Sequence, residues 1–343
     1  MKAVGLSRSL PIDDPQSLLD LELPDPPAPQ GRDLLVRVQA ISVNPVDTKL
    51  RRASAGSGEL DPPRILGFDA AGTVLATGPE VTAFAVGDEV YYAGDVTRPG
   101  CNAQLQWVDE RLAGRKPTTL DFAEAAALPL TTLTAWELLF QRMPYPLDGR
   151  RNIGKTLLVI GGAGGVGSMA IQLGRHAGFT VAATASRAQS AAWCRQMGAE
   201  HVIDHRQPLA PQLQALGISQ IEAALNLADT DRYWQELGEL LAPQGHVGLI
   251  VEPAGELRIG DPYKAKCIGI HWEFMFARAR FRTDDMIEQH RILTRAASLI
   301  DAGELHSTLT QRLGPINAAN LREAHRLLES GRSIGKLALE GWG

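Results

Sequence analysis

Cysteine is scarce in this chain, and the few cysteines stand far apart. Cys101, Cys194 and Cys267 form no CxxC pair in the 343 residues, so the sequence indicates neither a disulfide framework nor a cysteine-rich zinc site. No apolar run approaches the roughly 18 residues of a spanning helix, and the first residues turn polar at Ser7–Ser9, which argues against a membrane segment and a signal peptide. We therefore expect a cytoplasmic protein with no membrane partner.

An excess of one charge sign is also missing. Lys and Arg number 34 and Asp and Glu 39, a net charge of −5, which leaves no basic footprint for nucleic acid. The 44% hydrophobic and 21% charged residues are typical of a globular protein and exclude a disordered or coiled-coil chain. This length predicts roughly two domains of about 150 residues each.

The first third of the chain predicts β-structure. Short Val- and Ile-rich runs between Pro-rich turns are typical of a barrel or sandwich. The clearest of these runs are Leu34–Ile41, Ala71–Ala76 and Asp88–Tyr92. Ala- and Leu-rich stretches then predict helices over Asp121–Leu128 and Leu133–Phe140.

From residue 156 onwards, apolar runs alternate with helical stretches such as Val166–Ala177 and Arg232–Leu241. Such alternation indicates βαβ units in a doubly wound parallel sheet that binds a dinucleotide. The expected strands are Thr156–Ile160, Phe179–Thr184, His201–Ile203, Ile221–Leu227, His246–Ile250 and a run near Cys267–His271. Helices are expected over Asp284–Ala302 and Ala318–Ser330, and the strand-and-turn tail from residue 303 is expected to rejoin the first domain.

A glycine-rich turn lies between the first of these strands and its helix. Gly162, Gly164 and Gly167 fit GxGxxG: the first glycine allows a tight turn, the second a close approach to a pyrophosphate, and the third close packing of helix and strand. Amides at the helix start would face the anion. A glycine turn without a ligand is the alternative. The predicted cofactor contacts here are Gly162, Ala163, Gly164, Gly165, Val166 and Gly167.

The end of the second predicted strand indicates which dinucleotide binds. NAD-binding units usually carry Asp or Glu about 20 residues after the loop, but no acid occurs from Ser168 to Ala199. Ser186 and Arg187 stand there instead, and both suit the 2′-phosphate of NADP(H). His205 and Arg206 could reach the same phosphate, although surface exposure alone would also explain these residues.

Several segments, in order and spacing, resemble the medium-chain dehydrogenase/reductase superfamily over nearly the whole chain, and specifically its zinc-lacking quinone oxidoreductase type. Its NPxD, GxDxxG, VGDxV, AAxPxx and GK motifs are similar to Asn44–Asp47, Gly67–Gly72, Val86–Val90, Ala126–Thr131 and Gly335–Lys336. The resemblance implies an α/β protein with a GroES-like β-barrel catalytic domain (1–125 and 303–343) and a Rossmann domain (126–302). It further implies a homodimer and a cleft between the domains near Asn44, Thr131 and the glycine loop.

Zinc-dependent relatives carry a cysteine near the position of Asn44 and Gly-His-Glu where this chain has Gly67-Phe68-Asp69. Since zinc needs three or four ligands around one point, no metal is expected. Without that electrophile a simple ketone is a poor substrate, whereas a quinone or α,β-unsaturated carbonyl spreads charge onto an oxygen that a few donors can stabilise.

We therefore expect an NADPH-dependent quinone or enone reductase. The alternatives are a non-catalytic NADPH-binding sensor or structural protein and, less favoured, a zinc alcohol dehydrogenase. The expected catalytic residues are Asn44 and Thr131 as hydrogen-bond donors and Lys49 and Tyr91 as proton donors, with Thr134 and Lys336 as further cofactor contacts.

Overall fold

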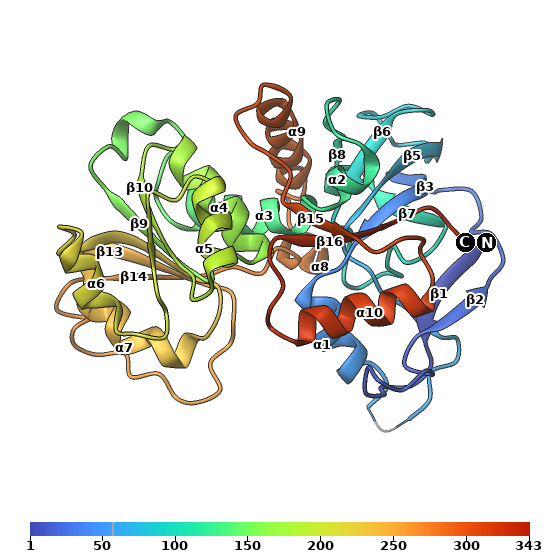
Figure 1. Cartoon of the computed structure of the whole chain (residues 1–343). Coiled ribbons are helices and arrows are strands. Elements are labelled where there is room, and N and C mark those ends of the chain that lie inside the picture. The colour runs from blue at the N-terminus through green and yellow to red at the C-terminus, as the bar shows by residue number, and fades with distance from the viewer. Residues whose placement is uncertain (57) are drawn as a thin grey trace. The chain divides into compact units, whose positions relative to one another are not determined.

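The chain forms two compact units in a computed structural model that describes residues 1–56 and 58–343. Unit 1 comprises Met1–Leu133 and Phe276–Gly343, and unit 2 comprises Thr134–Met275. The two chain ends meet in unit 1, where the Lys2 ammonium donates to the backbone oxygen of Gly343 (Figure 1).

Unit 1 also contains residues 126–133 and 276–302, which the sequence-based limits assign to the second domain. Helix α9 (Ile287–Asp301) lies against β8 (Ala113–Arg115). Beside β8, on the neighbouring strand β6 (Glu89–Tyr92), the Tyr91 hydroxyl donates to the Leu293 carbonyl over 2.6 Å. The domain limits expected from composition and family resemblance remain a prediction.

Unit 1 is built on a seven-stranded sheet in which the last strand of the chain pairs with an early one. Its order is β15 (Leu309–Arg312), β16 (Lys336–Glu340), β3 (Asp33–Ser42), β5 (Ala70–Thr77), β6 and β8, with β7 (Leu105–Asp109) also on β3. Strand β16 runs antiparallel to β3, with Leu339 opposite Ile41. A smaller sheet has the order β2 (Leu19–Glu22), β1 (Lys2–Leu6), β4 (Arg64–Ile65).

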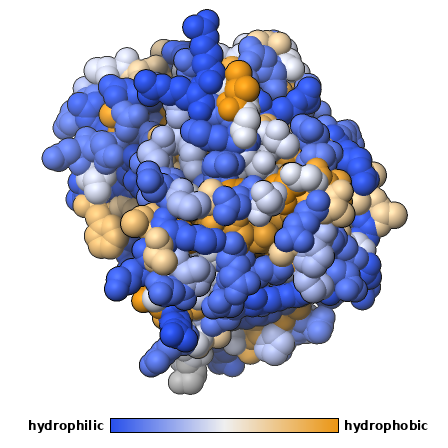
Figure 2. Space-filling model, turned by 90° about the vertical axis from the view of Figure 1, so that its left-hand side faces the viewer, coloured by the Kyte–Doolittle hydropathy of each residue, from blue (hydrophilic) through white to orange (hydrophobic). Residues whose placement is uncertain are grey.

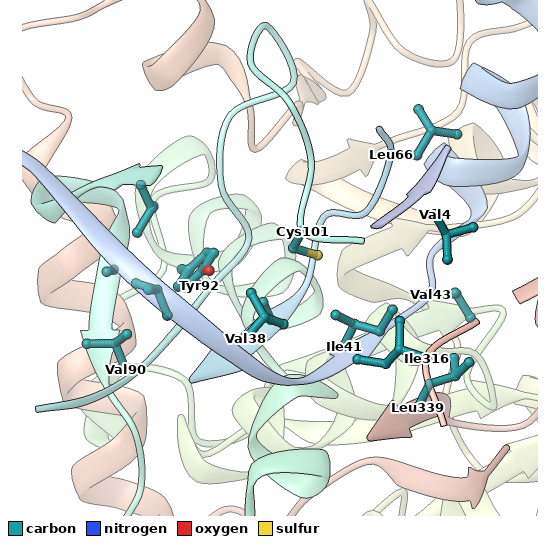
Figure 3. Packing of buried hydrophobic residues seen from close by; sticks show 14 of the residues in the cluster. Val4, Val38, Ile41, Val43, Leu66, Val90, Tyr92, Cys101, Ile316 and Leu339 are labelled. Atoms are coloured by element: carbon teal, nitrogen blue, oxygen red, sulfur yellow. The ribbon is translucent and has the colours of Figure 1, made fainter. Parts of the chain in front are cut away.

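Alternation along β3 explains the core of unit 1. Leu34, Val36, Val38 and Ala40 are buried, as the period of two in a strand requires. Figure 3 shows Val38 and other β3 residues within a cluster that also holds residues of β6 and β16. Helices α1 (Pro45–Ala53), α2 (Phe122–Ala126), α8 (Ala277–Phe281) and α10 (Ala318–Glu329) complete the unit.

Unit 2 contains a six-stranded sheet whose paired strands are all parallel, so the expected doubly wound sheet is confirmed. Its order is β11 (His201–Ile203), β10 (Thr180–Thr184), β9 (Thr156–Ile160), β12 (Ile221–Asn226), β13 (Leu241–Leu249), β14 (Gly269–Trp272). The helices are α4 (Gly165–His176), α5 (Ala188–Gln196), α6 (Leu209–Ala215) and α7 (Thr230–Leu240). The order reverses between β9 and β12, the switch point at which such sheets bind ligands.

Helix α3 (Pro129–Glu137) contains the boundary between the units, after Leu133. It begins earlier than the sequence predicts, with proline at its first position, where the missing N–H costs nothing. A π-helical turn, Leu138–Arg142, follows it.

Most large apolar side chains are buried. Figure 2 shows a face on which a band of apolar side chains lies among mostly hydrophilic ones. None of the helices that the structure describes is both long and apolar enough to cross a membrane.

Candidate active site

The glycine loop joins β9 to α4, and two of its glycines are required by the fold itself. A Cβ on Gly162 would lie 2.8 Å from the Ala183 Cβ, and one on Gly167 would lie 2.3 Å from the Gly161 carbonyl oxygen. Both distances are too short for a side chain. Close packing of β9, β10 and α4 therefore explains these two positions without any ligand.

Gly164 is different, because the surrounding protein does not need it to be glycine. A Cβ there would make only an ordinary contact, 3.5 Å from the Gly161 carbonyl oxygen, and the residue is exposed. It is also the N-cap of α4 and supplies no side-chain cap. The space above Gly164 and the first-turn amides of α4 thus suit the approach of a diphosphate.

None of the residues that directly follow β10 is an acid. Ser186 is half-buried, and exposed Arg187 forms the N-cap of α5. Thr184, the last residue of β10, accepts a hydrogen bond from the Gly161 amide at 3.0 Å. The β10 end is therefore fixed to the glycine loop, with the predicted phosphate contacts directly after it.

Two further basic residues, His205 and Arg232, lie close to each other in unit 2. Burial lowers the pKa of His205, and Arg232, Arg206 and Arg187 lower it further while Asp204 opposes them. Arg232 donates to the His205 carbonyl oxygen. The sequence reasoning missed Arg232, whose only signal was its place in the first turn of α7, the helix that follows β12.

Arg206 is already engaged by a neighbour. Its guanidinium donates to both carboxylate oxygens of Asp204 over 2.6–3.1 Å, and this pair lowers the pKa of Asp204 to about 2. A phosphate would therefore have to compete with Asp204 for the Arg206 guanidinium.

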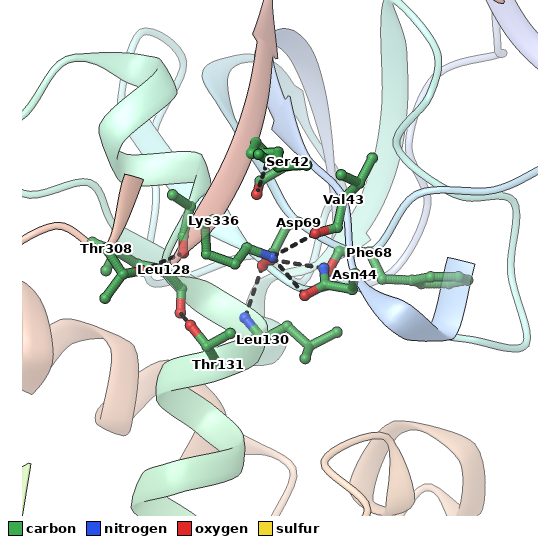
Figure 4. Close-up of polar contacts among 12 residues, drawn as sticks. Ser42, Val43, Asn44, Phe68, Asp69, Leu128, Leu130, Thr131, Thr308 and Lys336 are labelled. Carbon is green, nitrogen blue, oxygen red and sulfur yellow. Dashed lines mark hydrogen bonds and ion pairs between the residues drawn. The ribbon is translucent and has the colours of Figure 1, made fainter. Parts of the chain in front are cut away.

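A buried polar network in unit 1 brings the family-like motifs together (Figure 4). The Lys336 ammonium donates to the Val43 carbonyl oxygen at 2.9 Å, to Asn44 Oδ1 at 2.5 Å and to Asp69 Oδ2 at 2.8 Å. Asp69 also accepts from Asn44 Nδ2 and from the Leu130 amide, each at 2.8 Å. Segments from four distant parts of the sequence thus meet at one ion pair.

Local sequence explains how α1 presents Asn44 to this network. Asn44 is the N-cap of α1, and Asp47 accepts from the amides of Asn44, at 2.7 Å, and Gly67, at 3.1 Å. Gly67 has φ +107°, and a Cβ there would lie 2.5 Å from Asn102 Oδ1, so only glycine fits. Burial raises the pKa of Asp47 to about 7 and also raises that of Asp69, where Lys336 opposes it.

Three of the expected catalytic residues, Asn44, Thr131 and Tyr91, already donate side-chain hydrogen bonds within unit 1. Asn44 is fully buried and donates to the Phe68 carbonyl oxygen and to Asp69. The Thr131 hydroxyl donates to the Leu128 carbonyl oxygen at 3.0 Å. Tyr91 is fully buried, and burial raises its pKa, which makes it a poor acid.

The remaining expected residues lie elsewhere or serve the network. Lys49 is exposed on α1, and Thr134 is buried in α3. The Lys336 ammonium uses its three hydrogens within unit 1, which favours a structural role over the expected cofactor contact. Asp69, the centre of the network, was not singled out from the sequence, although it stands inside the GxDxxG segment.

The residues at the zinc-ligand positions do not suit zinc. An amide stands at Asn44 and a phenyl ring at Phe68, which packs edge-on to Phe276 with ring centres 5.2 Å apart. The Asp69 carboxylate already holds the Lys336 ammonium. Within residues 1–56 and 58–343, no group of three or more His, Cys, Asp or Glu side chains is placed to hold a metal ion.

Residues 30–129 match the alcohol dehydrogenase GroES-like domain family, and residues 197–339 match the zinc-binding dehydrogenase family. A zinc-type alcohol dehydrogenase-like protein of Staphylococcus aureus is 40% identical over 99% of both chains. The 2-methylene-furan-3-one reductase of Solanum lycopersicum is 36% identical over 50% of this chain and 44% of its own.

Solved structures agree with these matches. A putative zinc-dependent alcohol dehydrogenase from Rhizobium etli CFN 42 superposes with a TM-score of 0.93 at 50% identity, covering 100% of this chain and 98% of its own. A mycobacterial protein complexed with NADPH has a TM-score of 0.81 at 25% identity, covering 99% and 100%. With its GroES-like region, its parallel dinucleotide-type sheet and these full-length relatives, the chain belongs to the medium-chain dehydrogenase/reductase superfamily and is an oxidoreductase.

Proposed function

We propose that this protein is an NADPH-dependent, zinc-independent oxidoreductase that reduces a quinone or an α,β-unsaturated carbonyl. The observation that carries the proposal is the pairing of open space above Gly164 with an acid-free β10 end at Ser186 and Arg187. The NADPH in the mycobacterial structure of the same fold supports the choice of cofactor.

Two parts of the cofactor, the diphosphate and the 2′-phosphate, have candidate partners in unit 2. The first-turn amides of α4 would hold the diphosphate, and Ser186, Arg187 and His205 would hold the 2′-phosphate. Bound NADPH would supply a hydride. Gly164 keeps the backbone of the loop accessible, whereas Gly162 and Gly167 maintain its shape.

The substrate class follows from the absence of a zinc-type donor set at Asn44, Phe68 and Asp69. A conjugated substrate distributes the charge of the added hydride over several atoms, so it needs less electrophilic help than a simple ketone. The partial similarity to a furanone reductase points to the same class.

The buried network would act by positioning and not by donating protons. Asp69 accepts from the Leu130 amide and so fixes the start of α3, on which Thr131 and Thr134 lie. The Asn44 side chain accepts from Lys336 and donates to Asp69, and the positive charge of Lys336 compensates the Asp69 carboxylate. Since Tyr91 and Thr131 donate to backbone carbonyls, we propose that the product oxygen takes its proton from water.

A substrate panel tests the proposal. Quinones, enones and aldehydes are each offered with NADPH and, in parallel, with NADH, and nucleotide oxidation is followed by absorbance. We expect turnover with quinones or enones and NADPH, and little with aldehydes. Tight NADPH binding without turnover of any substrate would favour the non-catalytic alternative. Size-exclusion chromatography would test the further proposal of a homodimer.

Metal removal tests the zinc-independent part. After dialysis against EDTA we expect quinone or enone reduction to be unchanged, because the residues at the zinc positions are an amide, a phenyl ring and a lysine-paired carboxylate. Activity that disappears on dialysis and returns with Zn²⁺ would overturn it.

A further inference from the structure

A chain of two hydrogen bonds connects helix α5 to the glycine loop. Helices α4 and α5 lie side by side (Figure 1), and the indole N–H of Trp193 on α5 donates to Ser168 Oγ on α4 at 2.8 Å. The Ser168 hydroxyl in turn donates to the Gly164 carbonyl oxygen at 2.7 Å. The hydrogen-bond chain therefore ends on the glycine whose surroundings leave room for a diphosphate.

The Gly164 carbonyl is held by one bond more than the start of a helix requires. As the N-cap of α4, Gly164 accepts the first intrahelical bond, from the Ser168 amide at 2.8 Å. The buried Ser168 hydroxyl adds a second bond to the same oxygen. A hydroxyl has a single hydrogen, so the indole N–H of Trp193, which the Ser168 oxygen accepts, favours the rotamer that directs this hydrogen to Gly164.

The direction of this carbonyl sets the direction of the next amide. The peptide bond between Gly164 and Gly165 is planar and trans, so its C=O and its N–H point in opposite directions. Gly165 is the first residue of α4, and its N–H is one of the four that find no partner within a helix. A Gly164 carbonyl fixed by Ser168 therefore keeps the Gly165 N–H pointing out of the helix start, where an anion can accept from it.

We propose that Ser168 and Trp193 are positioning residues for the diphosphate of the cofactor. Ser168 holds the Gly164–Gly165 peptide in the orientation that donates to the diphosphate, and Trp193 acts through the Ser168 hydroxyl. This inference rests on the proposed binding of NADPH at the glycine loop. The competing explanation is a purely structural link between α4 and α5, and the experiment must distinguish the two.

Isothermal titration calorimetry with NADPH and with NADH tests the positioning role. Trp193→Phe keeps a large aromatic ring but loses the N–H donor, and it should bind both nucleotides about two- to tenfold more weakly, the range for one neutral hydrogen bond. Both nucleotides should be affected because both contain the diphosphate. Ser168→Ala removes the bond to Gly164 itself and should weaken binding at least as much. The double variant should bind no more weakly than Ser168→Ala, whereas additive losses would overturn the idea that Trp193 acts through the hydroxyl.

A nucleotide without a diphosphate distinguishes positioning from a loosened helix α5. 2′-AMP carries the 2′-phosphate alone, and its proposed contacts include Arg187, the N-cap of α5. We expect Trp193→Phe to bind 2′-AMP as the wild type does, while NADPH and NADH bind more weakly. Equal weakening of 2′-AMP and NADPH would mean that the substitution displaces α5 as a whole, and it would overturn the positioning role.

Trp234→Phe is the matched control. Trp234 lies on α7 in the same unit, and its indole N–H donates to the Arg258 carbonyl oxygen at 3.0 Å, outside the glycine loop. This variant should bind both nucleotides as the wild type does, and thermal melting without nucleotide shows that each variant is folded.

The outcomes separate this inference from the proposed function. Unchanged NADPH binding in both Trp193→Phe and Ser168→Ala would overturn the inference and leave the proposed function standing. A wild type that prefers NADH, with both variants weakened, would refute the proposed cofactor and support the inference. A wild type that binds neither nucleotide would overturn both.

Discussion

Arg187 offers the sharpest test of cofactor choice because the structure provides a matched control. Arg187 and Arg206 are both exposed arginines that follow strands of the parallel sheet in unit 2. The guanidinium of Arg206 is bound to Asp204 through several hydrogen bonds. Arg187 directly follows β10, where NAD-binding units carry an acid, so Arg187→Ala should weaken NADPH binding. Arg206→Ala should change it little, because Asp204 already holds that guanidinium.

The size of the effect follows from the type of contact. A hydrogen bond to a charged group contributes about 1.5–3 kcal/mol, which corresponds to about 10- to 100-fold in affinity. Arg187 is exposed, so screening by water and salt should keep the loss near tenfold. NADH lacks the 2′-phosphate, and its affinity should hardly change.

Fluorescence titration with each nucleotide, at low and high salt, measures these affinities. The wild type should prefer NADPH, and the preference should shrink as salt rises. The reasoning would be refuted if the wild type preferred NADH, or if Arg187→Ala weakened both nucleotides equally. A larger loss in Arg206→Ala than in Arg187→Ala would instead identify Arg206 as the phosphate contact.

Three further predictions test the glycine loop and the buried network. Gly164→Val should abolish NADPH binding in a folded protein, whereas Gly167→Val should lower the melting temperature itself, because its Cβ would lie 2.3 Å from a carbonyl oxygen; equal melting temperatures would contradict the packing argument. Lys336→Met should cost about 3–5 kcal/mol in urea unfolding by leaving a buried carboxylate unpaired, and adding Asp69→Asn should recover part of this; a loss under about 1 kcal/mol would show that the pair matters little. Asp47 has a pKa of about 7 in the folded chain against an ordinary 3.8, so as the pH rises its carboxyl group ionises first in the unfolded chain. The stability that the protonated group contributes is therefore fully present below about pH 4 and is lost as the pH rises through 7. Asp47→Asn loses one acceptor at every pH, but its deficit in urea unfolding should narrow between about pH 4 and pH 8; a constant deficit would contradict the raised pKa.

The parallel sheet and the glycine loop could be predicted because their signals are local. Each βαβ unit repeats a short apolar strand and a helix within a few dozen residues, and the spacing of Gly162, Gly164 and Gly167 is read within one turn. Strands such as β4, with two residues, carry no such signal, because their pairing and not their own sequence makes them strands. Helix α1 was missed although Val46, Leu50 and Ala53 stand at the i, i+4 and i+7 spacing of a helix, because nine residues are too few for that period to be recognised.

By itself, the sequence determined the dinucleotide-type fold of unit 2, the family resemblance and the acid-free end of β10. Only the tertiary structure decided what the polar residues do. Lys336 and Asp69 are 267 positions apart and form one ion pair. Both side chains are also hydrogen-bonded to the Asn44 amide group. The tertiary structure also decided that Tyr91 is buried and that Trp193 donates to Ser168. Backbone periodicity is written in neighbouring residues, whereas the hydrogen-bond partner of a side chain depends on which distant segments the folded chain brings within about 3 Å.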